Sequence, residues 1–207
     1  MSLPKNTNLN WQPSPFDARD FMSNRFRKFA STPMPYSLYP VYRAPIYNQL
    51  RIGSCTGNMG SSGLRYEAKE IGIDFSPSRL FQYYTNRLLI GMEEEDSGAY
   101  IRDVLKAMNK YGVCSEEIWP YEVDRFSEYP PDHVWEDALL QKVTQYARVP
   151  KTEEAIKRTI MSGAVVMFGF LIYESFDKGN WASTTGIMPD PSGAILGGHA
   201  VYTDGWE

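Results

Sequence analysis

The chain has 207 residues, of which 43% are hydrophobic, and its formal net charge is -4 at pH 7. That length can bury one sizeable core or two small lobes. The mildly acidic balance argues against a nucleic-acid partner, because phosphate binding needs a concentrated basic face. No stretch approaches the ~18 to 20 apolar residues that span a bilayer, and no secretory signal is visible. We therefore expect neither nucleic acid nor a membrane as a partner.

Cysteine usage bears on both chemistry and compartment. The chain has two cysteines, Cys55 and Cys114, so one disulfide is arithmetically possible. A reduced protein is the simpler interpretation, and it slightly favours a cytoplasmic location. No metal-ligand spacing or phosphate-binding loop is present, so we expect no metal and no cofactor.

Residues 1 to 44 form a distinct N-terminal extension. Recurrent prolines prevent a long helix, and many aromatic side chains give the segment apolar surface to bury. We therefore expect it to pack against the rest of the protein. A docked structural arm is the favoured interpretation, and an inhibitory segment that lies across an active cleft is the alternative.

Helices are expected in the middle of the chain. Cys55 to Ile71 is typical of a helix, although its closely spaced glycines weaken it and indicate a neighbouring backbone nearby. Ser76 is expected to cap a second helix that ends at Gly91. A third spans about Tyr100 to Tyr111. The acidic run Glu93 to Asp96 is interpreted as a solvated loop.

The later part of the chain favours strands. Lys142 to Val149 alternates like a strand, and the apolar run Ala164 to Tyr173 predicts a buried strand. Between them, Thr152 can cap a short helix. Gly179 to Gly193 is rich in turn residues, and Ala200 to Thr203 begins another strand. Helices first and strands later predict an α+β fold with two lobes.

One thiol and one imidazole stand out as a candidate catalytic pair. Gln49 lies six positions before Cys55, and His199 follows two glycines near the end of the sequence. Cys55 begins a helix, whose positive end favours a thiolate that can attack a carbonyl. Cys114 is better explained as a small buried apolar residue, and His133 as a surface or capping histidine. Cys55 and His199 are therefore the best pair, with Gln49 as a candidate oxyanion donor.

The tract from Gln49 to Cys55 resembles the papain-like cysteine peptidases. In that family a glutamine precedes the nucleophile by six residues, and Gly-Ser stands directly before the cysteine, as Gly53 and Ser54 do here. Gly-Ser-Cys-Thr is similar to bacterial members. Ile52 replaces the half-cystine that many relatives carry, which is consistent with a disulfide-poor branch.

Further segments resemble the same family in the same order along the chain, and they are Asp17 to Asp20, Ser97 to Tyr100 and Trp119 to Tyr121. The second of these is similar to the glycine-rich segment whose backbone pairs with an extended substrate. Gly98 keeps one of its two usual glycines. We expect Gly98, Ala99 and Gly198 to bind substrate.

The resemblance implies a papain-like α+β fold with a catalytic cleft between two lobes. Residues 45–141 would form a mainly helical lobe with the nucleophile, and residues 142–207 an antiparallel β lobe with the histidine. The Cys55 thiolate would attack a peptide carbonyl, and His199 would protonate the leaving amine. The Gln49 side chain and the Cys55 N–H would hold the oxyanion. The implied function is that of a cysteine endopeptidase, with a peptide or protein as its substrate.

One departure from the family leaves an alternative open. The family's histidine is oriented by an asparagine in an Asn-Ser-Trp motif one hairpin further on, and the sequence reaches Glu207 without it. We therefore expect the β lobe to be incomplete at this end. Asp204 is a poor substitute, because on a strand it points away from His199. A catalytically silent homologue that keeps the cleft as a peptide-binding module is the alternative, although joint retention of Gln49, Cys55 and His199 favours the peptidase.

Overall fold

The structure is a computed structural model that describes residues 9–23, 33–177 and 181–207. Its first part holds α1 (Cys55–Glu70), α2 (Arg79–Leu88), α3 (Ile101–Lys110), the 3-10 helix η2 (Val123–Arg125) and α4 (Asp132–Ala138). Its later part holds α5 (Glu153–Met161), β1 (Val166–Tyr173), α6 (Glu174–Asp177), α7 (Trp181–Thr184) and β2 (Ile195–Thr203). Residues 1–8 and 24–32 of the expected extension, and 179–180 of the expected loop, lie outside the described residues.

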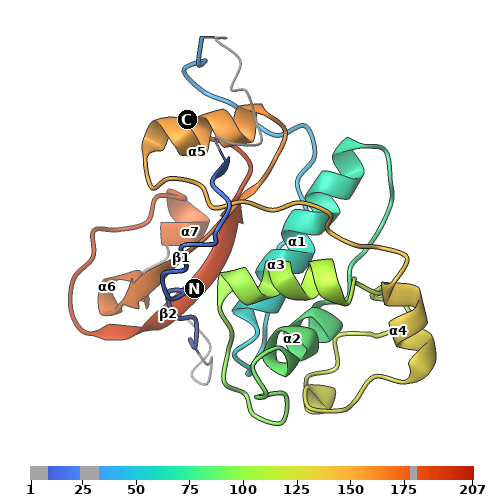
Figure 1. Cartoon of the computed structure of the whole chain (residues 1–207). Helices are drawn as coiled ribbons and strands as arrows, with labels where there is room; N and C mark the ends of the chain where they lie inside the picture. The colour runs from blue at the N-terminus through green and yellow to red at the C-terminus, as the bar shows by residue number, and fades with distance from the viewer. Residues whose placement is uncertain (1–8, 24–32, 178–180) are drawn as a thin grey trace.

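Figure 1 shows how these elements are arranged. Helices α1 to α4 gather on one side of the molecule, and the two-stranded sheet lies on the other side with α5, α6 and α7. α1 packs against both α2 and β2, so it joins the two halves. No helix within the described ranges is both long and apolar enough to cross a membrane.

The glycines of α1 let neighbouring helices approach closely, as the sequence predicted. A Cβ at Gly57 would lie 2.8 Å from the Arg79 carbonyl oxygen on α2. A Cβ at Gly60 would lie 2.6 Å from the Val104 side chain on α3. The cost of glycine in a helix is thus offset by close packing of three helices around the start of α1.

The sheet places alternate residues of β2 on opposite faces. β1 and β2 pair antiparallel, with Gly169 opposite Ala200 and Phe170 opposite His199. Ala200 is 3% exposed and packs in a buried cluster with Cys55 of α1. His199 lies on the other face, where its ring is 6.0 Å from that of Phe170.

Of the two predicted helix caps, one is confirmed and the other is wrong. Thr152 caps α5 as expected, because its hydroxyl accepts a hydrogen bond from the Ala155 N–H at 3.2 Å. The predicted cap of α2 at Ser76 is wrong. Ser78 caps that helix instead, accepting from the Phe81 N–H at 3.1 Å and donating to the Trp119 carbonyl at 2.6 Å.

The strand expected over Lys142 to Val149 is also wrong. Among the described residues, only Arg148 forms a β-bridge there, and its partner is Met22 of the N-terminal extension. The Arg148 N–H donates to the Phe21 carbonyl at 2.6 Å, and its carbonyl accepts from the Ser23 N–H at 2.9 Å. The alternating pattern therefore marks a short contact with the extension and not a strand of the sheet.

Candidate active site

Cys55 is the first residue of α1 and is 1% exposed. Burial raises the pKa of its thiol to about 11, although the backbone N–H groups of Ala200 and Trp11 near the sulfur lower it in part. From the sequence, the helix N-terminus was expected to favour a thiolate. In this structure burial outweighs that effect, so the thiol is neutral near pH 7.

The loop before the nucleophile is held by buried hydrogen bonds. The side-chain amide of Gln49 donates to the Ile52 carbonyl at 3.0 Å. The Tyr121 hydroxyl donates to the Gln49 carbonyl at 2.8 Å and also bonds the Ser54 hydroxyl. Asn58 donates to the Ser54 carbonyl at 2.9 Å. Tyr121 thus bonds both ends of the loop that leads to the nucleophile.

The structure places Ala200, the residue after His199, in the buried cluster that contains the nucleophile. Ala200 packs against Cys55, whereas no hydrogen bond joins Cys55 and His199 within the described part of the chain. The Nδ1 atom of His199 has no hydrogen-bond partner among those residues. Burial lowers the pKa of His199, so its imidazole is also neutral near pH 7.

The N-terminal extension lies over the glycines that were expected to bind substrate. The Gly198 N–H donates to the Leu9 carbonyl at 3.0 Å, and its carbonyl accepts from the Trp11 N–H at 3.2 Å. Gly98 has a φ of +71°, and a Cβ there would lie 2.5 Å from the Asn10 carbonyl oxygen. Ala99 is buried beside it. In Figure 1 the dark-blue part of the extension lies beside the sheet.

The Trp11 ring fills the space between the sheet and the nucleophile. A Cβ at Gly169 would come closer than 3.0 Å to three ring atoms of Trp11, so only glycine admits the indole at this point of β1. The ring packs against the buried cluster that contains Cys55 and Ala200. Residues 9 to 11 therefore cover the candidate nucleophile.

A second contact anchors the extension further along the chain. Asp20 accepts two hydrogen bonds from the Arg102 guanidinium on α3, at 2.9 and 2.6 Å. Arg148 adds a third at 3.1 Å. The Arg102 and Asp20 side chains are only 14% and 18% exposed, so water screens this pair weakly.

Asp96 is a site residue that was not predicted from the sequence. It was assigned to a solvated loop, but it is half-buried and its carboxylate accepts the Gly53 N–H at 2.8 and 3.1 Å. The Tyr83 hydroxyl donates to the same carboxylate. Its place two residues before Gly98 was the one signal in the sequence. The bonds that matter reach residues far away in the chain, so no local pattern predicted them.

The remaining cysteine and histidine lie as the sequence predicted. Cys114 is fully buried, and burial raises the pKa of its thiol to about 12. His133 is exposed in the first turn of α4. Neither residue competes with Cys55 or His199 for a catalytic role.

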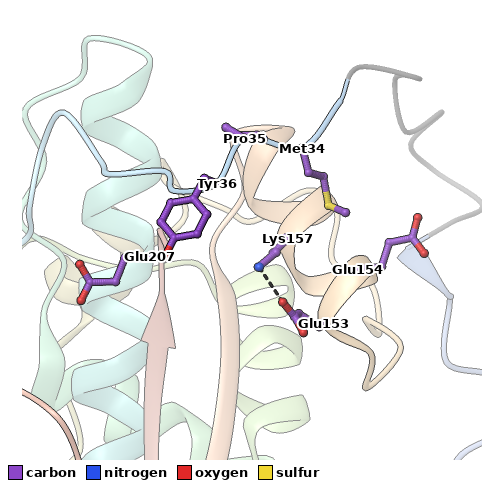
Figure 2. A pocket seen from close by; sticks show the side chains of 7 residues that line it. All are labelled: Met34, Pro35, Tyr36, Glu153, Glu154, Lys157 and Glu207. Atoms are coloured by element: carbon purple, nitrogen blue, oxygen red, sulfur yellow. Dashed lines mark hydrogen bonds and ion pairs between the residues drawn. The ribbon is translucent and has the colours of Figure 1, made fainter.

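A separate pocket of about 560 Å³ lies on α5, away from the nucleophile (Figure 2). Its lining residues come from the N-terminal extension, from α5 and from the last residue of the sequence, and they are Met34, Pro35, Tyr36, Glu153, Glu154, Lys157 and Glu207. Lys157 pairs with Glu153 at 2.6 Å. None of the candidate catalytic residues lines this pocket, so we do not assign it to the chemistry.

Comparison with known proteins identifies relatives, although no protein-family model matches the chain. An uncharacterized peptidase C1-like protein of Acanthamoeba polyphaga mimivirus is 40% identical over 172 residues, which are 77% of this chain and 55% of that protein. This chain thus spans about half the length of that curated relative. Xylellain, a cysteine protease from Xylella fastidiosa, is 31% identical with a TM-score of 0.81, over 100% of this chain and 82% of that chain.

A more distant solved structure agrees on the fold. A cysteine protease of Carica candamarcensis in complex with E-64 has a TM-score of 0.57 and 21% identity, over 83% of this chain and 77% of that chain. The chain therefore has the papain-like fold, and both of its cysteines are free, as in the predicted disulfide-poor branch. By its likeness to xylellain over most of both chains, it belongs to the papain-like cysteine peptidases.

Proposed function

We propose that this chain is a cysteine endopeptidase whose site is kept latent by its own N-terminal extension. The observation that carries the proposal is the backbone of Leu9 to Trp11. Leu9 and Trp11 both bond Gly198, Asn10 lies against Gly98, and the Trp11 N–H lies near the Cys55 sulfur. A groove that binds extended backbone next to a buried thiol offers what peptide hydrolysis needs, because it holds a peptide bond near a nucleophile.

In this proposal the two halves of the molecule have separate roles. Residues 45–141 supply the nucleophile and its loop, and residues 142–207 supply the histidine. The catalytic cleft lies between them, where α1 meets β2. Residues 1–44 act as the intramolecular inhibitor, and a peptide or protein substrate takes their place when they leave.

The chemistry follows from the groups at the site. Once the extension leaves, His199 takes the proton of the Cys55 thiol, and the thiolate attacks the peptide carbonyl carbon. The Gln49 amide and the Cys55 N–H stabilise the oxyanion, and one such donor contributes about 3 kcal/mol. The imidazolium then protonates the leaving amine. Water hydrolyses the acyl-enzyme and restores the thiol. The neutral thiol and imidazole of the covered site fit the latent state.

The test combines turnover with covalent labelling. We would measure hydrolysis of a fluorogenic peptide and of denatured casein, and map labelling of Cys55 by the epoxide E-64, in the unaltered chain and in Trp11→Ala. Trp11→Ala should label and hydrolyse faster, because the indole no longer covers the thiol. Phe16→Ala is the matched control, since that aromatic residue of the same extension is 84% exposed and should change nothing.

Two outcomes separate the proposal from its alternative. Cys55→Ser should abolish both hydrolysis and labelling, while Cys114 stays unlabelled in every variant. If Trp11→Ala binds peptides but neither hydrolyses them nor reacts with E-64, the chain is a silent peptide-binding module. The endopeptidase proposal is then wrong.

A further inference from the structure

The acidic loop before Gly98 is fixed from within by a buried arginine. Arg87 of α2 is fully buried, and its guanidinium donates to the Glu93 carbonyl at 2.7 Å and to the Glu95 carbonyl at 2.6 Å. The same guanidinium lies 4.0 Å from the centre of the Tyr83 ring. The backbone that leads into Asp96 is therefore held by two charge-assisted hydrogen bonds, although Glu94 and Glu95 are exposed.

Asp96 receives hydrogen bonds from two separate parts of the site. Its carboxylate accepts the Gly53 N–H, two residues before the nucleophile, at 2.8 and 3.1 Å. It also accepts the Tyr83 hydroxyl, which is held on the fully buried face of α2. That hydroxyl in turn accepts the Gly98 N–H at 3.2 Å. One path of hydrogen bonds thus runs from Gly53 through Asp96 and Tyr83 to Gly98.

We propose that Asp96 and Tyr83 are positioning residues that set the distance between the nucleophile loop and the substrate-binding glycine. A carboxylate is suited to this task, because hydrogen bonds to a charged acceptor are about twice as strong as neutral ones. The path ties together two segments more than 40 residues apart in sequence. Its catalytic consequence rests on the proposed endopeptidase function, whereas the path itself does not.

The path is tested first without catalysis. Amide hydrogen exchange at Gly53 and Gly98 would be followed by NMR in the full chain and in Asp96→Ala, Asp96→Asn and Tyr83→Phe. Asp96→Ala should speed exchange at Gly53 by ~10- to 100-fold, the range expected for loss of a hydrogen bond to a charged group. The exchange rate of Gly53 in Asp96→Asn should lie between those of the unaltered chain and Asp96→Ala, since the amide oxygen of asparagine still accepts a hydrogen bond. Tyr83→Phe should act mainly on Gly98.

A matched control comes from the same loop. Glu94 is exposed, so Glu94→Ala should leave both amides as protected as in the unaltered chain. Equal protection at Gly53 in Asp96→Ala and in Glu94→Ala overturns the proposal, whatever the activity of the chain.

The catalytic consequence is measured in the Trp11→Ala background, where the site is uncovered. Asp96→Ala should lower kcat and the rate of E-64 labelling by ~10- to 100-fold with less than about threefold change in KM, and Asp96→Asn should restore part of both. A lower melting temperature with an unchanged labelling rate would make Asp96 structural only and overturn the proposal. If Trp11→Ala itself neither labels nor hydrolyses, the endopeptidase proposal fails, and the exchange data alone decide whether the path exists.

Discussion

Gly169→Ala should uncover the nucleophile without touching it. The added methyl group would come closer than 3.0 Å to three ring atoms of Trp11, and the ring has no flexible end that can move aside. The extension must therefore shift or leave. Alanine suits a strand better than glycine does, so the sheet itself should not lose stability.

The size of the effect follows from the cost of overpacking. An extra methyl group in a well-packed site costs about 1 to 3 kcal/mol. Each ~1.4 kcal/mol changes an equilibrium tenfold, so the uncovered state should become about 5- to 150-fold more populated. If iodoacetamide reaches Cys55 only in that state, its alkylation rate should rise by the same factor.

The assay is alkylation at pH 8 followed by peptide mass mapping, with the buried Cys114 as an internal reference. The double variant Trp11→Ala/Gly169→Ala is the control, because it removes the ring atoms that the extra methyl group would strike. An alkylation rate in Gly169→Ala within twofold of the unaltered chain would refute the packing of Trp11 on Gly169. Faster alkylation of Cys55 in the double variant than in Trp11→Ala alone would refute it too.

Three further results are expected. In the unaltered chain, the alkylation rate of Cys55 should be low at pH 8 and should rise as the pH approaches the pKa of its thiol, about 11. The alkylation rate of Cys114 should rise at higher pH, because the pKa of its thiol is about 12. Fast alkylation of Cys55 at neutral pH would contradict this prediction. Asp20→Asn removes the charged partner of Arg102, so limited proteolysis within residues 9–23 should be ~10-fold faster, and unchanged cleavage would show that the ion pair does not anchor the extension. The lowered pKa of His199 means that the unfolded chain binds its proton first as the pH falls, so the free energy of unfolding should decrease below about pH 6.5. Urea titrations should show a smaller decrease in His199→Gln, and identical slopes would exclude a contribution from this histidine.

Much of the helical framework could be predicted from local patterns. The expected helix from Cys55 to Ile71 differs from α1 by one residue, and the periodic apolar face of α3 placed that helix within one residue at each end. Thr152 was identified as a cap because a hydroxyl just before a helix satisfies a free backbone N–H. These features depend on residues close together in the chain, so the sequence contains their cause.

The parts that were missed depend on contacts between distant segments. Ser76 and Ser78 are equally good caps by composition, and the bond from Ser78 to the Trp119 carbonyl decides between them. The alternating pattern around Arg148 predicted a strand, but Arg148 pairs with the N-terminal extension and not with a strand of the sheet. Asp96 could not be distinguished by sequence from the other acidic residues of its loop, because its hydrogen-bond partner Gly53 is distant in the chain. In each case the outcome depends on which distant residue lies nearby in the folded chain, and a local sequence pattern does not contain that information.

The two backbone bonds between the extension and Gly198 also set how an outside peptide can compete. An occupant tethered to the same molecule acts as though present at roughly millimolar concentration when its linker is short and flexible. Micromolar peptide therefore leaves Leu9 and Trp11 in place. One cut between Trp11 and Gln49 changes this balance, because the released piece must then bind as a separate molecule. Dilution alone would remove it, and the outcome would depend on total protein concentration.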